Sequence, residues 1–265
     1  MSRYELEFLG VGTAGAAELG ESSAVLLRDG EPMLLIDCGA LVPSRYAARF
    51  GAPPRALYIT HTHLDHVGGL ERLFVELYFD ESRRGRVPVF VAAPVVPLLQ
   101  ERVASHPNAL AEGGVNFWDA FQLIPVTRGF WFDGTWFDVF PVRHHAADAA
   151  FGLALRGSFV YTGDTRPVPE MLARYAGHGE RVFHDCALHG NPSHSGLEDI
   201  RREYAPDMWP RMVLYHFEGR SQGDELRNAG FEVAAAGQRF ELPPPATLPA
   251  DEAVRLRFGK PAITG

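Results

Sequence analysis

The sequence predicts a domain of layered α and β structure, and two observations lead to this. Short runs rich in Val, Leu and Phe, typical of buried strands, alternate along the chain with helical patterns. Most predicted strands also end at a histidine or an aspartate, and a sheet brings strand ends together at one edge. No linker divides the first 242 of the 265 residues. We therefore expect one domain over residues 1–242, followed by a proline-containing tail over 243–265.

The first elements are predicted from alternation and turn residues. Residues 4–9 alternate apolar side chains with Glu, as a half-exposed strand does. The dipeptide Asp29-Gly30 is a hairpin signal between strands 24–28 and 33–37. A serine start and a glycine stop bound a helix over 44–50.

The middle of the chain is predicted to alternate strands and helices. Strand 56–60 leads into a histidine-rich stretch, and apolar residues at helical spacing follow over 70–78. Another strand is predicted over 87–92, then a helix over 94–103 with proline in its first turn. Residues 116–128 are apolar without a decisive period and stay unassigned.

The second half continues the same pattern. A turn at Asp133-Gly134 starts a strand over 135–143, and two strands hinged at Gly157 follow over 151–156 and 158–163. The remaining predicted elements are a helix over 169–176, strands over 181–185, 212–215 and 238–242, and a helix opened by a capping box at Ser195 and continuing to about residue 204.

Composition disfavours long nucleic acid and membranes as partners. The formal net charge is −8 and the pI about 5.8, which disfavours an extended basic face for long nucleic acid. No apolar signal core opens the chain and no run approaches the ~20 apolar residues of a membrane span, so we expect a cytoplasmic protein without a membrane partner. Cys38 and Cys186 lack metal-type spacing and are interpreted as buried reduced thiols.

A glycine-rich turn after the first strand matches a dinucleotide fingerprint. Gly10-Val11-Gly12-Thr13-Ala14-Gly15 has the form G-x-G-x-x-G. The few residues before the next strand leave no room for the crossover helix that a Rossmann unit requires. We therefore expect a loop that curls beside a site.

The stretch His61-Thr62-His63-Leu64-Asp65-His66 places three imidazoles and a carboxylate within six residues. These groups are ligands that divalent metals, zinc above all, take from proteins. Buried without a cation, charged imidazoles would repel one another and neutral ones would each need a partner. Further candidate ligands end other predicted strands: Asp37, His144, Asp164, His184, Asp185 and His216.

In order and spacing this pattern resembles the metallo-β-lactamase superfamily. The residues that carry the resemblance are Asp37, the stretch 61–66, His144, Asp164 in Tyr161-Thr162-Gly163-Asp164-Thr165, and His216 in Leu214-Tyr215-His216-Phe217. Residues 8–14, Asp164 and His194 look like its phosphodiesterase branch, which includes ribonuclease Z and cyclic-phosphate phosphodiesterases. The resemblance implies a four-layer αβ/βα sandwich of two mixed sheets with helices on the outer faces.

The resemblance also implies a ligand set for two divalent metal ions, expected to be zinc, although manganese, iron and nickel accept the same ligands. One ion would be held by His61, His63 and His144, the other by Asp65, His66 and His216, with Asp164 bridging them. His144 matches the family pattern better than its neighbour His145, but which of the two binds metal stays open. Asp37 is expected to orient the histidine loop as a hydrogen-bond acceptor rather than to bind metal.

The catalytic residues that the resemblance implies are Asp65, His194 and Asp185. In the resembling branch a histidine before a helix pairs with a carboxylate, and here those positions are His194 and Asp185, with Asp in place of Glu. We expect Asp185 to orient His194, which stabilises a phosphoryl oxygen or protonates the leaving group. The remaining histidines, His106, His178 and His189, are interpreted as surface residues.

The resulting prediction is a dinuclear hydrolase that cleaves a small phosphodiester or cyclic phosphate through a metal-bridging hydroxide. The short span between His144 and Asp164 leaves no room for the basic arm of ribonuclease Z, which disfavours tRNA processing. Two alternatives stay open: a thioester or lactone hydrolase of the same fold, and a metal-stabilised sensor without turnover. The expected partners are a small-molecule substrate and, in a homodimer, a second copy of the chain.

Overall fold

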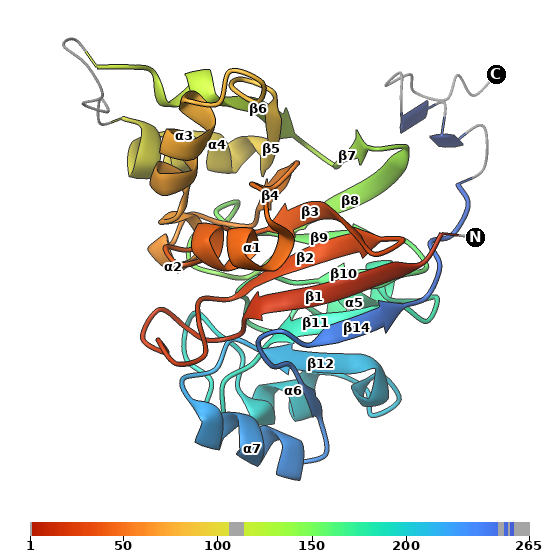
Figure 1. Ribbon diagram of the computed structural model, residues 1–265. Coiled ribbons are helices and arrows are strands. Elements are labelled where there is room, and N and C mark those ends of the chain that lie inside the picture. The colour runs from red at the N-terminus through yellow and green to blue at the C-terminus, as the bar shows by residue number, and fades with distance from the viewer. Residues whose placement is uncertain (1, 106–113, 249–251, 254, 257–265) are drawn as a thin grey trace.

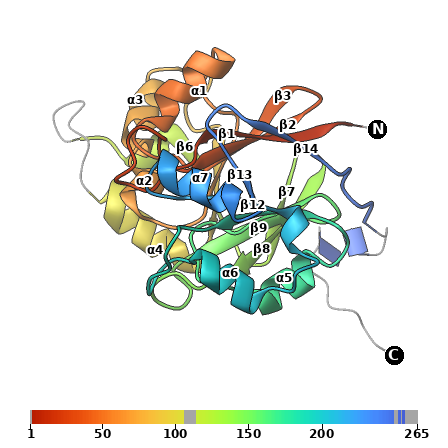
Figure 2. The same cartoon turned by 90° about the horizontal axis from the view of Figure 1, so that it is seen from below.

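The computed structural model describes residues 2–105, 114–248, 252–253 and 255–256. Within them, two seven-stranded mixed sheets pack face to face (Figures 1 and 2). Helices α1 and α3 lie on the outer side of one sheet, and α5 and α6 on the outer side of the other. The predicted four-layer αβ/βα sandwich is therefore confirmed.

The first sheet joins an antiparallel half to a parallel half. Its antiparallel half, from β14 to β3, brings the last strand of the chain beside the first, with Tyr4 opposite Leu242. From β3 to β6 the pairing is parallel. In spatial order its strands are β14 (Arg239–Leu242), β1 (Tyr4–Gly10), β2 (Ser23–Arg28), β3 (Glu31–Ile36), β4 (Leu57–Ile59), β5 (Val87–Ala92) and β6 (Phe121–Val126).

The second sheet has the same division. Its half from β10 to β13 is parallel, and the half from β7 to β10 is antiparallel. In spatial order its strands are β13 (Glu232–Val233), β12 (Met212–Tyr215), β11 (Arg181–Asp185), β10 (Phe159–Tyr161), β9 (Phe151–Leu155), β8 (Thr135–Pro141) and β7 (Gly129–Phe132).

The helices are short and connect the strands. The α-helices are α1 (Val42–Phe50), α2 (Leu64–Val67), α3 (Leu70–Tyr78), α4 (Val96–Leu99), α5 (Pro169–Tyr175), α6 (Leu197–Glu203) and α7 (Arg220–Asn228). Single turns of other helical types are η1 (Ala93–Val95), η2 (Gln100–Ala104), η3 (Phe117–Ala120) and η4 (Trp209–Arg211). None of the helices in the described part of the chain is long and apolar enough to cross a membrane.

Aromatic side chains fill the space between the sheets. Phe8 of β1 is fully buried and contacts Tyr161, Phe183 and Tyr215, one residue from each of three strands of the opposite sheet. Its ring centroid lies 5.4 Å from that of Tyr215. Buried aromatic pairs of this kind contribute about 0.5–1.5 kcal/mol beyond their burial. They fix the two sheets relative to each other, and with them the strand ends that carry the candidate ligands.

The structure corrects several local expectations. The first strand, predicted to be half-exposed, is buried along its whole length, including Glu5 and Glu7. The helix predicted from Ser195 begins at Leu197, because Ser195 Oγ donates instead to the carbonyl of Thr165 at 2.8 Å. The helix predicted over 94–103 is three short turns of different type, in a segment with prolines at 94 and 97. Helix α7 was not predicted, since in this polar segment only Gly223 and Leu226 are buried.

The tail beyond β14 contacts the domain where it is described. The backbone N–H of Ala246 donates to the carbonyl of Arg156 at 2.8 Å, and the Arg156 guanidinium pairs with Glu252 at 2.9 Å. The N-terminal end of β1 lies at the opposite end of the sheets from α2 (Figure 1). Leu242, the last residue of β14, lies opposite Tyr4 at this end of β1, so the tail starts here. The described part of the tail is therefore remote from the histidine-rich stretch.

Candidate metal centre

The candidate site lies where several strands end. Asp37 follows β3, His61 follows β4, Asp164 follows β10, Asp185 ends β11, and His216 follows β12. All of these strands belong to the parallel halves of the two sheets, so their carboxyl ends point to the same edge of the sandwich. Residues far apart in the sequence are thereby brought within contact distance.

The histidine-rich stretch presents its ligands by ending β4 and starting one turn of helix. His63 caps α2, and the backbone N–H of His66 donates to its carbonyl at 2.9 Å. This turn directs Asp65 and His66 into the protein, where both are buried, and leaves Leu64 58% exposed on the other side. A single helical turn therefore determines which side chains of this motif point into the protein and which point to solvent.

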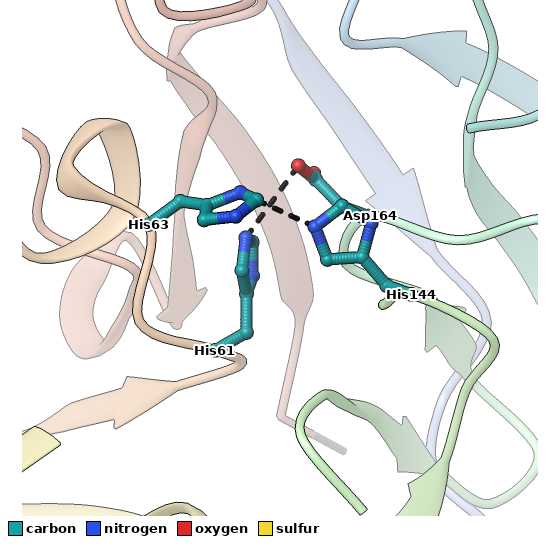
Figure 3. Close-up of side chains that lie close together, drawn as sticks. All are labelled: His61, His63, His144 and Asp164. Atoms are coloured by element: carbon teal, nitrogen blue, oxygen red, sulfur yellow. Dashed lines mark hydrogen bonds and ion pairs between the residues drawn. The ribbon is translucent and has the colours of Figure 1, made fainter. Parts of the chain in front are cut away.

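The first cluster consists of His61, His63, His144 and Asp164 (Figure 3). One nitrogen or oxygen atom from each lies within 4.8 Å of the others. His63 Nδ1 is 3.2 Å from His144 Nε2, and His61 Nε2 is 3.6 Å from Asp164 Oδ2. Three imidazoles and one carboxylate at these separations match the donor set of a zinc site.

The second cluster consists of Asp65, His66, Asp164 and His216, all of them buried. Asp164 Oδ2 lies 3.3 Å from His66 Nε2 and 3.2 Å from His216 Nε2. The same carboxylate therefore belongs to both clusters. Such a shared anionic group is what two neighbouring cations require, because their mutual repulsion needs negative charge between them.

Five of the atoms that face the centre of these clusters have no hydrogen-bond partner. They are buried, although an unpaired buried polar atom costs about 1–3 kcal/mol. The atoms are His61 Nε2, His66 Nε2, His216 Nε2 and both carboxylate oxygens of Asp164. Unpaired lone pairs that converge on one space fit metal ligation, so the residues present suit the ions that the sequence predicts.

The pKa values differ between the clusters. Burial lowers the pKa of His61 well below its usual value and that of His144 to about 4, so both imidazoles are neutral, the form that binds metal. Burial also acts against a charge on His216, but Asp164, Asp185 and Asp65 outweigh it and raise its pKa to about 10. The second cluster therefore holds excess negative charge that a cation would neutralise.

The imidazoles are oriented by partners on their outer nitrogens. Thr60 Oγ1 donates to Asp37 Oδ2 at 2.8 Å and so accepts from His61 Nδ1 at 3.0 Å. His66 Nδ1 donates to the same Asp37 oxygen at 2.8 Å. Asp37 also accepts from the backbone N–H of Thr60 and belongs to neither cluster. It occupies the orienting position expected for it.

The adjacent residues His144 and His145 lie in different environments. His144 is buried, contributes Nε2 to the first cluster, and donates from Nδ1 to the carbonyl of Ser193 at 2.9 Å. His145 is exposed, lies outside the clusters, and has a left-handed backbone with φ 58°. Its Nε2 lies 2.7 Å from His63 Nε2. The geometry thus favours His144 as the ligand of the two.

His194 and Asp185 lie beside the second cluster and form with Asp164 and His216 a third group of potential ligands. His194 Nδ1 donates to Asp185 Oδ2 at 2.9 Å, and its ring stacks on His216 with centroids 4.9 Å apart. Burial acts to lower the pKa of His194, but the hydrogen bond to Asp185 and the charge of that carboxylate raise it. Asp185 Oδ2 also accepts from the backbone N–H of Thr165 at 2.8 Å, which fixes the carboxylate.

Some contributors had no signal in the sequence. The Ser193 carbonyl that orients His144 is a backbone group, and the hydroxyl of Thr60 is one among many. His184, which ends a predicted strand, is buried away from the clusters and bonds the hydroxyl of Tyr204 at 2.7 Å. Of the histidines expected on the surface, His178 and His189 are exposed, and His106 lies outside the described residues.

Comparison with known proteins decides the family. The family model described as "Anti-Pycsar protein Apyc1" matches residues 4–240. The chain belongs to the anti-Pycsar Apyc1 family. The Apyc1 protein of Paenibacillus harenae is 31% identical over 247 residues, spanning 89% of this chain and 99% of the relative. That of Bacillus phage 010DV004 is 30% identical over 263 residues, spanning 90% and 95%.

Solved structures place this Apyc1 family member in a wider fold. A diphosphatase of the PhnP family is 20% identical with a TM-score of 0.68, covering 90% of this chain and 98% of that one. The metallo-β-lactamase fold protein YhfI of Bacillus subtilis is 13% identical with a TM-score of 0.67, covering 91% and 100%. Yeast PDE1 is 16% identical with a TM-score of 0.60, covering 92% and 100%. The resemblance predicted from the sequence is confirmed.

Proposed function

We propose that the protein is a two-metal hydrolase that cleaves a small cyclic phosphodiester, with a cyclic nucleotide as the substrate class. The observation that carries the proposal is the position of Asp164, whose carboxylate belongs to both clusters and is buried without a hydrogen-bond partner. Two-metal sites of this kind serve phosphodiester cleavage because paired cations stabilise both the attacking and the leaving oxygen.

In this proposal each cluster holds one ion. His61, His63 and His144 hold the first, Asp65, His66 and His216 the second, and Asp164 lies between them. The bound ions supply Lewis acidity, which activates water and neutralises the charge that develops on phosphoryl oxygens. Zinc is the expected metal, since imidazole and carboxylate ligands suit it. The chain's own task is to orient these imidazoles and shield them from bulk water, and in the first cluster burial also lowers the pKa of His61 and His144 and keeps both neutral.

His194 supplies the proton for the leaving group. Its contact with Asp185 holds the ring in place and raises its pKa, which favours the protonated form at neutral pH. The side chain is 20% exposed, in contrast to the buried ligands His66 and His216. A partly open imidazole beside two candidate ion sites is suited to donate a proton to an alkoxide as it leaves.

The substrate class rests on the relatives. The matching curated proteins are anti-Pycsar proteins, which points to small cyclic nucleotides. The net charge of −8 agrees with a small substrate rather than a long polyanion. Thioester and lactone hydrolysis remain the competing enzymatic activities, because the same ligands support them.

The test is a parallel assay of the metal-loaded protein. We expect turnover of 3′,5′-cyclic mononucleotides and of bis-p-nitrophenyl phosphate, and its loss in Asp164→Asn, a variant of nearly identical shape. A thioester and a lactone serve as the comparison substrates. Turnover of the thioester or the lactone alone would refute the phosphodiesterase proposal. Two bound metals without turnover of any of these substrates would favour the sensor.

A further inference from the structure

We infer that His145 is a positioning residue for the first metal site and acts through His63. The inference rests on the metal site proposed above and extends it to a residue outside both clusters. His145 is the neighbour that sequence reasoning left as an alternative ligand. Its position differs from that of the candidate ligands. His145 is exposed beside the first cluster, and its Nε2 lies 2.7 Å from His63 Nε2.

The outer nitrogens of the inward-facing histidines show why this contact matters. His61 bonds the Thr60 hydroxyl, His66 bonds Asp37, and His144 bonds the carbonyl of Ser193. His216 Nδ1 faces Asp185 Oδ1 at 3.4 Å. Such partners fix the tautomer and the ring orientation of a metal-binding histidine. For His63, the corresponding outer nitrogen is Nε2, and the group at hydrogen-bond distance is His145.

The proton between the two rings follows from this geometry. His63 directs Nδ1 toward His144 Nε2 and the rest of the first cluster, so a ligating Nδ1 must carry a lone pair. The proton of neutral His63 is then on Nε2, which donates to the lone pair of His145 Nε2. A rotation of the His63 ring would break this bond, so His145 holds Nδ1 toward the metal position.

The backbone of His145 supports a specific placement. Its φ of 58° lies in the left-handed region, which few residues other than glycine adopt. Left-handed backbone at a non-glycine residue persists where the surrounding structure determines it, and it concentrates at functional sites. Here it turns the chain directly after His144, so that consecutive imidazoles contact the same His63 from two directions, with ring centroids at 4.8 and 4.5 Å.

The experiment measures metal affinity rather than turnover. His145→Gly removes the imidazole without backbone strain, and His145→Gln restores an acceptor at a similar reach. We expect His145→Gly to weaken first-site affinity about tenfold or more in competition with a chelator, with second-site affinity unchanged, and His145→Gln to recover most of it. The Co²⁺ absorption spectrum reports the geometry of the first site. His189→Gly, another exposed loop histidine, is the matched control.

The outcomes separate the two proposals. First-site affinity within twofold of the wild type in His145→Gly would overturn the positioning role alone. Equal losses in the Gly and Gln variants would also overturn it, because the hydrogen bond would then not be the cause. A wild-type protein that binds no first-site metal would overturn this inference together with the proposed function.

Discussion

The two ligand clusters share Asp164 but differ in what surrounds them. The outer nitrogens of the second cluster face buried carboxylates, Asp37 for His66 and Asp185 for His216. Those of the first face no carboxylate directly, and their partners are the Thr60 hydroxyl, a backbone carbonyl and the exposed His145. A carboxylate partner raises the basicity of a ligating imidazole more than a neutral partner does. The second site is therefore expected to bind its cation more tightly.

The largest expected effect comes from the residue that joins the clusters. Replacing a hydrogen-bond partner of a ligand costs about 10- to 100-fold in metal affinity, and a shared ligand should cost more. We expect Asp164→Asn to lower the metal affinity of both sites by more than about 100-fold. Asp65→Asn should lower the metal affinity of the second site alone. Metal content after dialysis against a chelator measures this. Retention of both ions in Asp164→Asn would show that Asp164 is not a ligand shared by the two sites.

His194 tests whether a residue that contacts a candidate metal ligand also binds the metal. His194 stacks on His216 and bonds Asp185, but in our proposal it donates a proton. His194→Ala is expected to lower kcat by roughly 10²-fold, as loss of a general acid does. Both metals should remain bound. Loss of a metal from this variant would identify His194 as a ligand instead.

The difference between charged and neutral partners has its own test. Asp37→Asn keeps the shape of the side chain but removes the charge behind His66, and it should weaken second-site affinity about 10- to 100-fold. Thr60→Val removes only the hydroxyl behind His61 and should weaken the first site by less than about tenfold. Site-resolved chelator titrations compare the two variants. Equal effects would show that the charge of the partner does not matter here.

The pKa values predict that metal binding depends on pH differently at the two sites. His216 has its pKa raised to about 10 in the metal-free protein, so at pH 7 a cation must displace its proton. Burial also disfavours a charge on His66, but Asp164 and Asp37 raise its pKa well above the usual value, so second-site affinity should rise by about tenfold or more per pH unit above about pH 7. His144, with its pKa lowered to about 4, is already neutral, and its site should be nearly independent of pH above about 6. Calorimetry in buffers of different ionisation enthalpy counts the released protons.

The sequence predicted which strand-end residues come together, because their order and spacing are properties of the chain itself. His61, Asp164 and His216 each follow a strongly apolar strand, and parallel pairing brings those ends to one edge. The partners of the ligands were less accessible. The Ser193 carbonyl has no side-chain signal, and the left-handed turn at His145 depends on contacts that form only in the folded protein.

The local errors have the same origin. Ser195 has the pattern of a helix cap, but its hydroxyl bonds Thr165 from a neighbouring strand end, so a tertiary contact replaced the local one. Helix α7 escaped prediction because it buries only Gly223 and Leu226 and shows no apolar stripe. Local pattern was decisive for strands with two buried faces, and weak for segments that contact the fold on one narrow side.

The pairing of β14 with β1 has a consequence for synthesis. The first strand of the chain, residues 4–10, cannot complete its sheet until residues 239–242 have left the ribosome. Until then an edge of β1 offers unpaired N–H and C=O groups, which are sites for association between nascent chains. The second cluster also waits for His216. Metal binding at the second site is therefore expected only after most of the chain has been synthesised. The nearly complete fold, rather than residues 61–66 alone, then determines which ion binds.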